Sequence, residues 1–132
     1  MTRTQSQILT ILLCHVRDML SLAVRYYAVP SIDVTMAGMR VVVRQIPGPW
    51  PTRDGAGYAA YLLVGADIAL DDDQPGLMRM CAYAYGQHAD VTQAFAEMQD
   101  NLNTRRTEAG LFAVPSMDER VRDMLAGDRT AL

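Results

Sequence analysis

Along residues 5–27 the polar side chains gather on one narrow stripe, and most other positions are apolar. The stripe residues recur at helical spacing: Gln7, Thr10, Cys14, Arg17, Asp18, Ser21 and Arg25. This pattern predicts one long helix, started by a capping box of Thr4 and Gln7 and prevented from continuing by Pro30. Because the polar stripe is narrow, we expect the helix to be mostly buried, with a sheet on one side and something else on another.

Residues 31–46 follow a pattern of period two, which predicts a β-hairpin that turns at Ala37–Gly38. A two-residue loop gathers six apolar residues on one face, as the pairs Met36 with Met39, Val34 with Val41, and Ile32 with Val43. The other face receives the polar residues Asp33, Thr35, Arg40 and Arg44. In this register Asp33 lies diagonal to both arginines, which is a favourable arrangement of charge.

The segment 58–70, YAAYLLVGADIAL, is apolar on both of its alternating sets of positions. We interpret residues 58–65 as a third strand buried on both faces, with a possible extension to residue 70. A helix is the open alternative, because a short apolar run does not distinguish the two structures.

Three helices are predicted after this strand. The first begins near Pro75, is capped by Asp72 or Asp73, carries LMRMCAYAY and ends or bends at Gly86. The second starts at a capping box of Asp90 and Gln93 and has a clean apolar stripe, formed by Val91, Ala94, Phe95, Met98 and Leu102. The third follows a capping box of Ser116 and Glu119 and stops at Gly127.

The order of these elements predicts one α+β domain over residues 1–132. It has a long N-terminal helix, a three-stranded antiparallel sheet made of the hairpin and a third strand, and three C-terminal helices packed on that sheet. Half of the residues are apolar and 20% are charged, which is typical of a globular chain.

The charge balance argues against a large nucleic-acid interface. The net charge is −3, and the one basic concentration, which begins at Arg105 and Arg106, alternates with acidic residues. All basic residues other than histidine are arginines, a bias that favours a bacterial or phage origin with a GC-rich genome.

Two further features bear on the location of the protein. Cys14 and Cys81 are isolated in apolar segments, which favours buried, reduced thiols in a cytoplasmic protein. Arg17 and Asp18 interrupt the apolar N-terminal segment, so we expect neither a signal peptide nor a membrane span.

The segment 46–58, IPGPWPTRDGAGY, is a stiff and unusually long link between strands. It has one GxG but neither a phosphate-loop motif nor a dinucleotide fingerprint, and it precedes a strand, so no cofactor is expected here. Its prolines favour an extended arm, and Trp50 either folds back onto the core or projects as an interface anchor.

Other candidates for chemistry are weak. The carboxylates of Asp71, Asp72 and Asp73, with Asp67 nearby, are suitable ligands for Mg²⁺ or Ca²⁺, but consecutive residues do not converge on one ion, so helix capping is the preferred interpretation. His15 lies among the apolar residues of the first helix, where we expect a hydrogen-bonded core histidine.

We therefore expect a small protein-binding module, an accessory, inhibitor or chaperone-like protein, that forms a homodimer through its first helix or a sheet edge. The expected partner contacts are Trp50, Pro49, Arg53, Tyr58 and Tyr61. The alternative is a small-molecule-binding protein or enzyme, whose pocket would be lined by His15, Arg40, Arg44 and Tyr83. A weak nucleic-acid binder is the third hypothesis.

Overall fold

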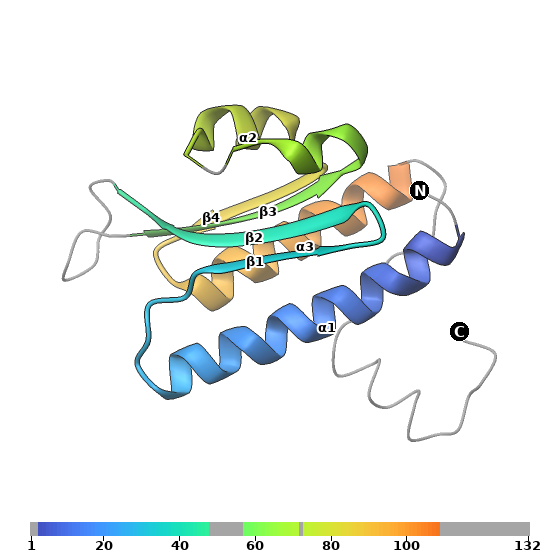
Figure 1. Cartoon of the computed structure of the whole chain (residues 1–132). Coiled ribbons are helices and arrows are strands. Elements are labelled where there is room, and N and C mark those ends of the chain that lie inside the picture. Colours follow the sequence, from blue (N-terminus) through green and yellow to red (C-terminus); the bar gives the residue numbers. More distant parts are fainter. Residues whose placement is uncertain (1–2, 48–56, 72, 109–132) are drawn as a thin grey trace, which may run out of the picture.

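A computed structural model describes residues 3–47, 57–71 and 73–108. Its elements are, in chain order, α1 (Arg3–Arg25), β1 (Ile32–Met36), β2 (Met39–Ile46), β3 (Gly57–Val64), the 3₁₀ turn η1 (Gly65–Ala69), α2 (Pro75–Cys81), β4 (Ala84–His88) and α3 (Val91–Glu108). The strands form one antiparallel sheet in the order β1-β2-β3-β4. Helices α1 and α3 cover one face of the sheet, and η1 and α2 lie on the other (Figure 1).

The α+β class, the N-terminal helix and the antiparallel sheet agree with the prediction from sequence, but the sheet has four strands instead of three. Two helices, α2 and α3, follow β3 within the described residues. The third predicted C-terminal helix falls on residues 109–132, which lie outside them.

The β1–β2 hairpin has the predicted register. Met36 pairs with Met39, Val34 with Val41, and Ile32 with Val43. The two turn residues Ala37 and Gly38 have φ angles of 51° and 76°, as the two-residue turns that match strand twist require. Gly65, also at positive φ (68°), turns the chain out of β3 into η1, so the possible extension of this strand to residue 70 was wrong.

The helix predicted from Pro75 to Gly86 is the main error. Helix α2 ends at Cys81, and residues 84–88 instead pair with β3 as β4. Its N-cap is Gln74, without a side-chain capping bond, so Asp73 does not cap it. Residues 84–88 form a strand despite their local helical pattern. Without this strand, one edge of the apolar strand β3 would have unpaired backbone groups.

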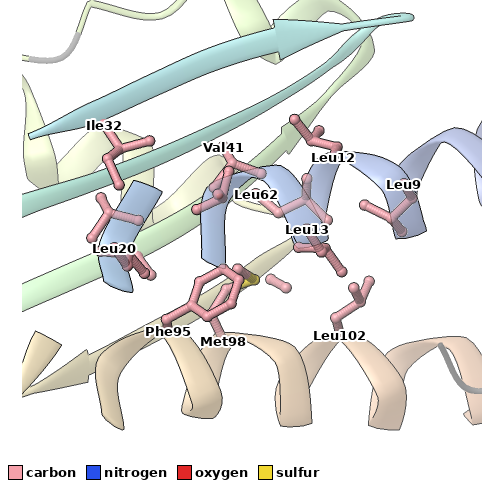
Figure 2. Packing of buried hydrophobic residues seen from close by; sticks show 14 of the residues in the cluster. Leu9, Leu12, Leu13, Leu20, Ile32, Val41, Leu62, Phe95, Met98 and Leu102 are labelled. Carbon is pink, nitrogen blue, oxygen red and sulfur yellow. The ribbon is translucent and has the colours of Figure 1, made fainter. Parts of the chain in front are cut away.

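The larger core lies between the sheet and the pair α1 and α3 (Figure 2). Helix α1 supplies Leu9, Leu12, Leu13, Val16 and Leu20, and α3 supplies the predicted stripe of Val91, Ala94, Phe95, Met98 and Leu102. Asp90 caps α3 as expected, since its Oδ1 accepts from the backbone N–H groups of Thr92 (2.7 Å) and Gln93 (3.3 Å).

Helix α1 is less buried than its narrow polar stripe predicted. It packs on the sheet as expected, but Ile11, His15 and Leu22 on its outer side are exposed. By length and composition α1 is also apolar enough to cross a membrane, with a mean hydropathy of 1.5 in its best window, of which 33% is buried in the fold. A helix that packs on the core of a folded domain meets the same criterion.

Candidate functional site

The second face of the sheet is incompletely covered, and this leaves a groove. The residues buried there are Val42, Ala59, Tyr61, Leu63 and Met78. Their cover is η1 and the two-turn helix α2, which is too short to shield the whole face. Two adjoining cavities of about 170 and 240 Å³ remain beside α2.

We call this surface the α2 groove. Both cavities are lined by Ile46, Pro47, Tyr61 and Pro75. The first cavity adds Arg44, Gln45, Asp73 and Met78, and the second adds Gly76, Arg79, Tyr85 and Gln87. The groove thus runs from the end of β2, across β3, to the outer strand β4.

Two tyrosines from neighbouring strands form an aromatic floor. Tyr61 on β3 pairs directly with Tyr85 on β4, and their ring centroids lie 5.1 Å apart at an interplanar angle of 54°. Burial, reinforced by Tyr85, raises the pKa of Tyr61 to about 12, and burial also raises the pKa of Tyr85. Both phenols are therefore protonated at neutral pH, and the Tyr85 hydroxyl donates a hydrogen bond to Gln87 Oε1.

Arginines stand at the sides of this floor. The guanidinium of Arg79 on α2 lies 5.0 Å from the centroid of the Tyr85 ring, within cation–π range. Arg44 lines the groove from β2, and Asp73 contributes the one carboxylate among the groove residues named above. The groove therefore offers an aromatic and aliphatic surface flanked by more positive than negative charge.

Arg40, a predicted pocket residue, holds the cover of this face in place instead of lining the groove. Its guanidinium donates to both carboxylate oxygens of Asp33, at 2.7 and 2.6 Å, and to the carbonyls of Ile68 (3.0 Å) and Leu70 (2.7 Å). The hydrogen bonds from Arg40 lower the pKa of Asp33, and the charges of Arg40 and Arg44 act in the same direction. Arg40 is 9% exposed, so it is a buried link between the sheet and η1.

The predicted partner contacts are only partly placed. Trp50, Pro49 and Arg53 lie outside the described residues. Tyr58 and Tyr61 belong to opposite sheet faces, Tyr58 to the α1 side and Tyr61 to the α2 side, because side chains alternate along a strand. The chain leaves β2 at Pro47, which lines the α2 groove, and re-enters the sheet at Gly57, which pairs with Ile46.

The structure does not assemble the alternative pocket. Arg40 and Arg44 lie on the α2 side of the sheet. His15 lies on α1, on the opposite side of the sheet, and is exposed. The prediction that it is a core histidine was therefore wrong. When Leu12 and Val16 face the sheet, residue 15 of the same helix faces away from it. Tyr83 packs against the α1-side core, with the Arg105 guanidinium 4.0 Å from its ring centroid.

The remaining candidates are also separated. Cys14 and Cys81 are only partly buried, which corrects the prediction of buried thiols, and they lie on helices that cover opposite sheet faces. Asp71 and Asp73 are exposed, and Asp72 lies outside the described part of the chain. In residues 3–47, 57–71 and 73–108, no three Asp, Glu, His or Cys side chains come close enough together to hold a metal ion.

Most groove residues were missed from the sequence, and the reason is specific. Tyr85 and Gln87 join the groove only because residues 84–88 form a strand, and the sequence pattern there was interpreted as a helix. The sequence signal that favours a strand here is the alternation of Tyr83, Tyr85 and Gln87 with small residues. Comparison of the chain with known protein families, with curated proteins and with solved structures finds no match.

Proposed function

We propose that this protein is a small protein-binding module that engages its partner through the α2 groove. It would act as an accessory, inhibitor or chaperone-like protein in the cytoplasm. The observation that carries this proposal is the groove itself: an aromatic floor of Tyr61 and Tyr85, left open on a sheet face that α2 is too short to cover.

The outer side of α2 extends the apolar surface. Met80 is 84% exposed and Leu77 is also exposed, although Met78 between them points into the core. Met and Tyr side chains adapt to varied surfaces and are enriched at protein interfaces, and arginine is enriched there too. A partner segment with apolar side chains and a net negative charge would complement this surface, because Arg44 and Arg79 flank it.

The size of the groove favours a protein over a small molecule. Pockets for small ligands are typically about 300–1,000 Å³ and enclose most of the ligand. The two cavities are about 170 and 240 Å³, smaller than that range and arranged side by side. A run of side chains from a partner, each filling one cavity, suits this shape better than one compact ligand.

The chemistry of the groove gives the enzyme hypothesis little support. A tyrosine that acts as a base or nucleophile needs a lowered pKa, and the pKa values of Tyr61 and Tyr85 are raised. His15 lies on the other side of the sheet. The net charge of −3 likewise gives nucleic-acid binding little support.

Site-specific photocrosslinking in the natural host tests the proposal. A benzophenone amino acid is placed at Gln87 in the groove and at Met80 beside it, and at the exposed Ala96 on α3 as a control on the other sheet face. We expect the same partner to be crosslinked from Gln87 and Met80 but not from Ala96, and we expect Arg79→Glu to weaken this crosslinking. Crosslinking from Ala96 alone, or from none of the three positions, would reject the groove as the partner site.

A further inference from the structure

The outer side of α1 carries a second exposed surface, separate from the α2 groove. We call it the α1 seam: Ile11, His15, Asp18, Leu22 and Arg25, which follow one another at spacings of four, three, four and three residues and all face solvent. This spacing places them along one line of the helix. Leu22, at 54% exposure, is the apolar residue in the carboxyl-terminal half of the seam.

The chain just after the seam exposes more apolar surface than the end of a helix needs. Tyr26 is 70% and Tyr27 97% exposed, and Val29 is also exposed. The helix ends through hydrogen bonds from Ala28 N–H to Ala23 O (2.8 Å) and from Tyr27 N–H to Val24 O (3.2 Å), which is a Schellman arrangement. Tyr27 occupies its left-handed position (φ 56°), where glycine is the usual and less strained residue.

A fully exposed tyrosine in a strained backbone conformation is unfavourable in an isolated chain. The left-handed conformation costs about 1–2 kcal/mol for a residue with a Cβ, and strain of this kind persists where another interaction depends on it. Exposure and strain together make Tyr27 a candidate for a contact outside its own chain.

We infer that the α1 seam binds a second copy of this chain, with two α1 helices crossing at Leu22 about a two-fold axis. The seam complements itself, which favours a second copy as the occupant. Asp18 lies one turn before Leu22 and Arg25 one turn after it, on the same line. A two-fold axis through Leu22 exchanges the two ends, so Asp18 of each copy lies beside Arg25 of the other, and the pair is formed twice.

The same axis brings Tyr27 toward the second copy. Tyr27 follows Leu22 by five residues, so along the crossed helices its exposed ring reaches the level of Asp18 of the other copy. An exposed tyrosine at this level can pack its ring against the second helix and keep its hydroxyl in water.

The available area is consistent with the apolar centre of a dimer interface. At exposures of 70% and 97%, Tyr26 and Tyr27 together present on the order of 300 Å². A standard interface takes about 800 Å² from each partner, with an apolar centre and a polar rim. Leu22 and Val29 enlarge the apolar part, and Asp18 and Arg25 provide charged positions at its margin.

Sedimentation velocity over a range of concentrations tests this inference with a charge swap. The wild-type full chain should be a dimer in reversible equilibrium with monomer. Asp18→Arg alone or Arg25→Asp alone places like charges together and should raise the dissociation constant at least about tenfold. The double variant Asp18→Arg/Arg25→Asp restores opposite charges and should recover most of the affinity, whereas Met80→Asp in the other surface should leave it unchanged.

Because these positions are exposed, the variants should fold, and circular dichroism checks this. Leu22→Asp, which brings two negative charges together at the axis, should give a monomer with an unchanged spectrum. A monomeric wild type would overturn the inference and assign the seam to another occupant, such as a partner protein or residues 109–132. A dimer that is unaffected by Leu22→Asp, or single variants that the double variant does not rescue, would also overturn it.

Discussion

Gly86 on β4 and Ala94 on α3 lie so close that a Cβ on Gly86 would be 2.1 Å from the carbonyl oxygen of Ala94. The same Cβ would be 2.4 Å from the backbone nitrogen of Met98. Backbone atoms of a packed helix cannot turn aside as a flexible side chain does. The absence of a side chain at residue 86 is therefore what allows α3 to rest directly on the outer strand.

We predict that Gly86→Ala destabilises the protein by about 3 kcal/mol, the upper part of the usual range for overpacking, because α3 has to shift as a unit. Thermal or urea unfolding measures the difference. Gly76→Ala is the matched control: nothing lies within 4 Å of a Cβ at Gly76, which is helical, so that variant should be neutral or slightly more stable. Equal effects of the two substitutions would contradict the close packing of β4 and α3.

Arg40 and Asp33 should respond unequally to mutation although they are partners. The Arg40 side chain is buried and also satisfies the carbonyls of Ile68 and Leu70, whereas the Asp33 side chain is 44% exposed and can turn to water. We expect Arg40→Met to cost about 2–4 kcal/mol and Asp33→Asn about 1 kcal/mol or less. A larger loss in Asp33→Asn than in Arg40→Met, measured by denaturant unfolding, would reject this role for Arg40.

The Arg40–Asp33 pair also predicts how stability depends on pH in acidic solution. The pKa of Asp33 is lower in the folded protein than its ordinary value of 3.8, chiefly through its hydrogen bonds from Arg40. Its contribution to stability is therefore present above about pH 4 and is lost as the pH falls through the lowered folded pKa. Between pH 5 and pH 2, Asp33→Asn should lose less stability than the wild type, and parallel loss in the two proteins would contradict the prediction.

The raised pKa of Tyr61 predicts that stability falls as the pH rises in alkaline solution. Its folded pKa, about 12, exceeds the unfolded value of about 10, so its contribution is complete below pH 10 and is lost as the pH rises toward 12. Absorbance at 295 nm should show at least one tyrosine that ionises only above pH 11 in the native protein. Tyr61→Phe should remove this late step and reduce the loss of stability between pH 10 and 12. If the late ionisation step persists in Tyr61→Phe, it belongs to another tyrosine.

The hairpin and the groove show what sequence patterns can specify. The β1–β2 register was predictable because both strands and their turn lie within residues 31–46, and a slip by one residue would turn the three apolar side chains of β1 away from those of β2. The aromatic floor was not predictable in this way. It depends on the pairing of Tyr61 with Tyr85, which are 24 residues apart in the sequence. Around Tyr85, a local helical pattern competes with pairing to the edge of β3.

The exposure of His15 has a related cause. The apolar residues of α1 outnumber those that one sheet face can cover, so their pattern alone does not show which of them face the core. Tyr58 and Tyr61 lie on opposite faces of the sheet because residues three apart in a strand point to opposite sides.

Trp50 follows Pro47 by three positions, and Pro47 lines the α2 groove. If the segment from 48 to 56 contributes to partner binding, Trp50→Ala should reduce crosslinking from Gln87 several-fold while the melting temperature stays unchanged. Pro51→Ala, one residue away, is a control for nonspecific effects on the segment. If the Trp50 variant is crosslinked as fully as the wild type, the tryptophan is not part of the proposed contact. The proposal for the groove itself would be unaffected.

Tyr27→Gly separates the stability of the monomer from self-association, because it should change the two in opposite directions. Glycine relieves the left-handed backbone conformation but increases the freedom of the unfolded chain, so the folded monomer should gain between about 0 and 1 kcal/mol. Loss of the ring should meanwhile weaken the dimer about tenfold or more. Unfolding is therefore measured at a concentration where the protein is monomeric, and association by sedimentation. A variant that associates as tightly as the wild type would show that Tyr27 is exposed for a reason other than self-association.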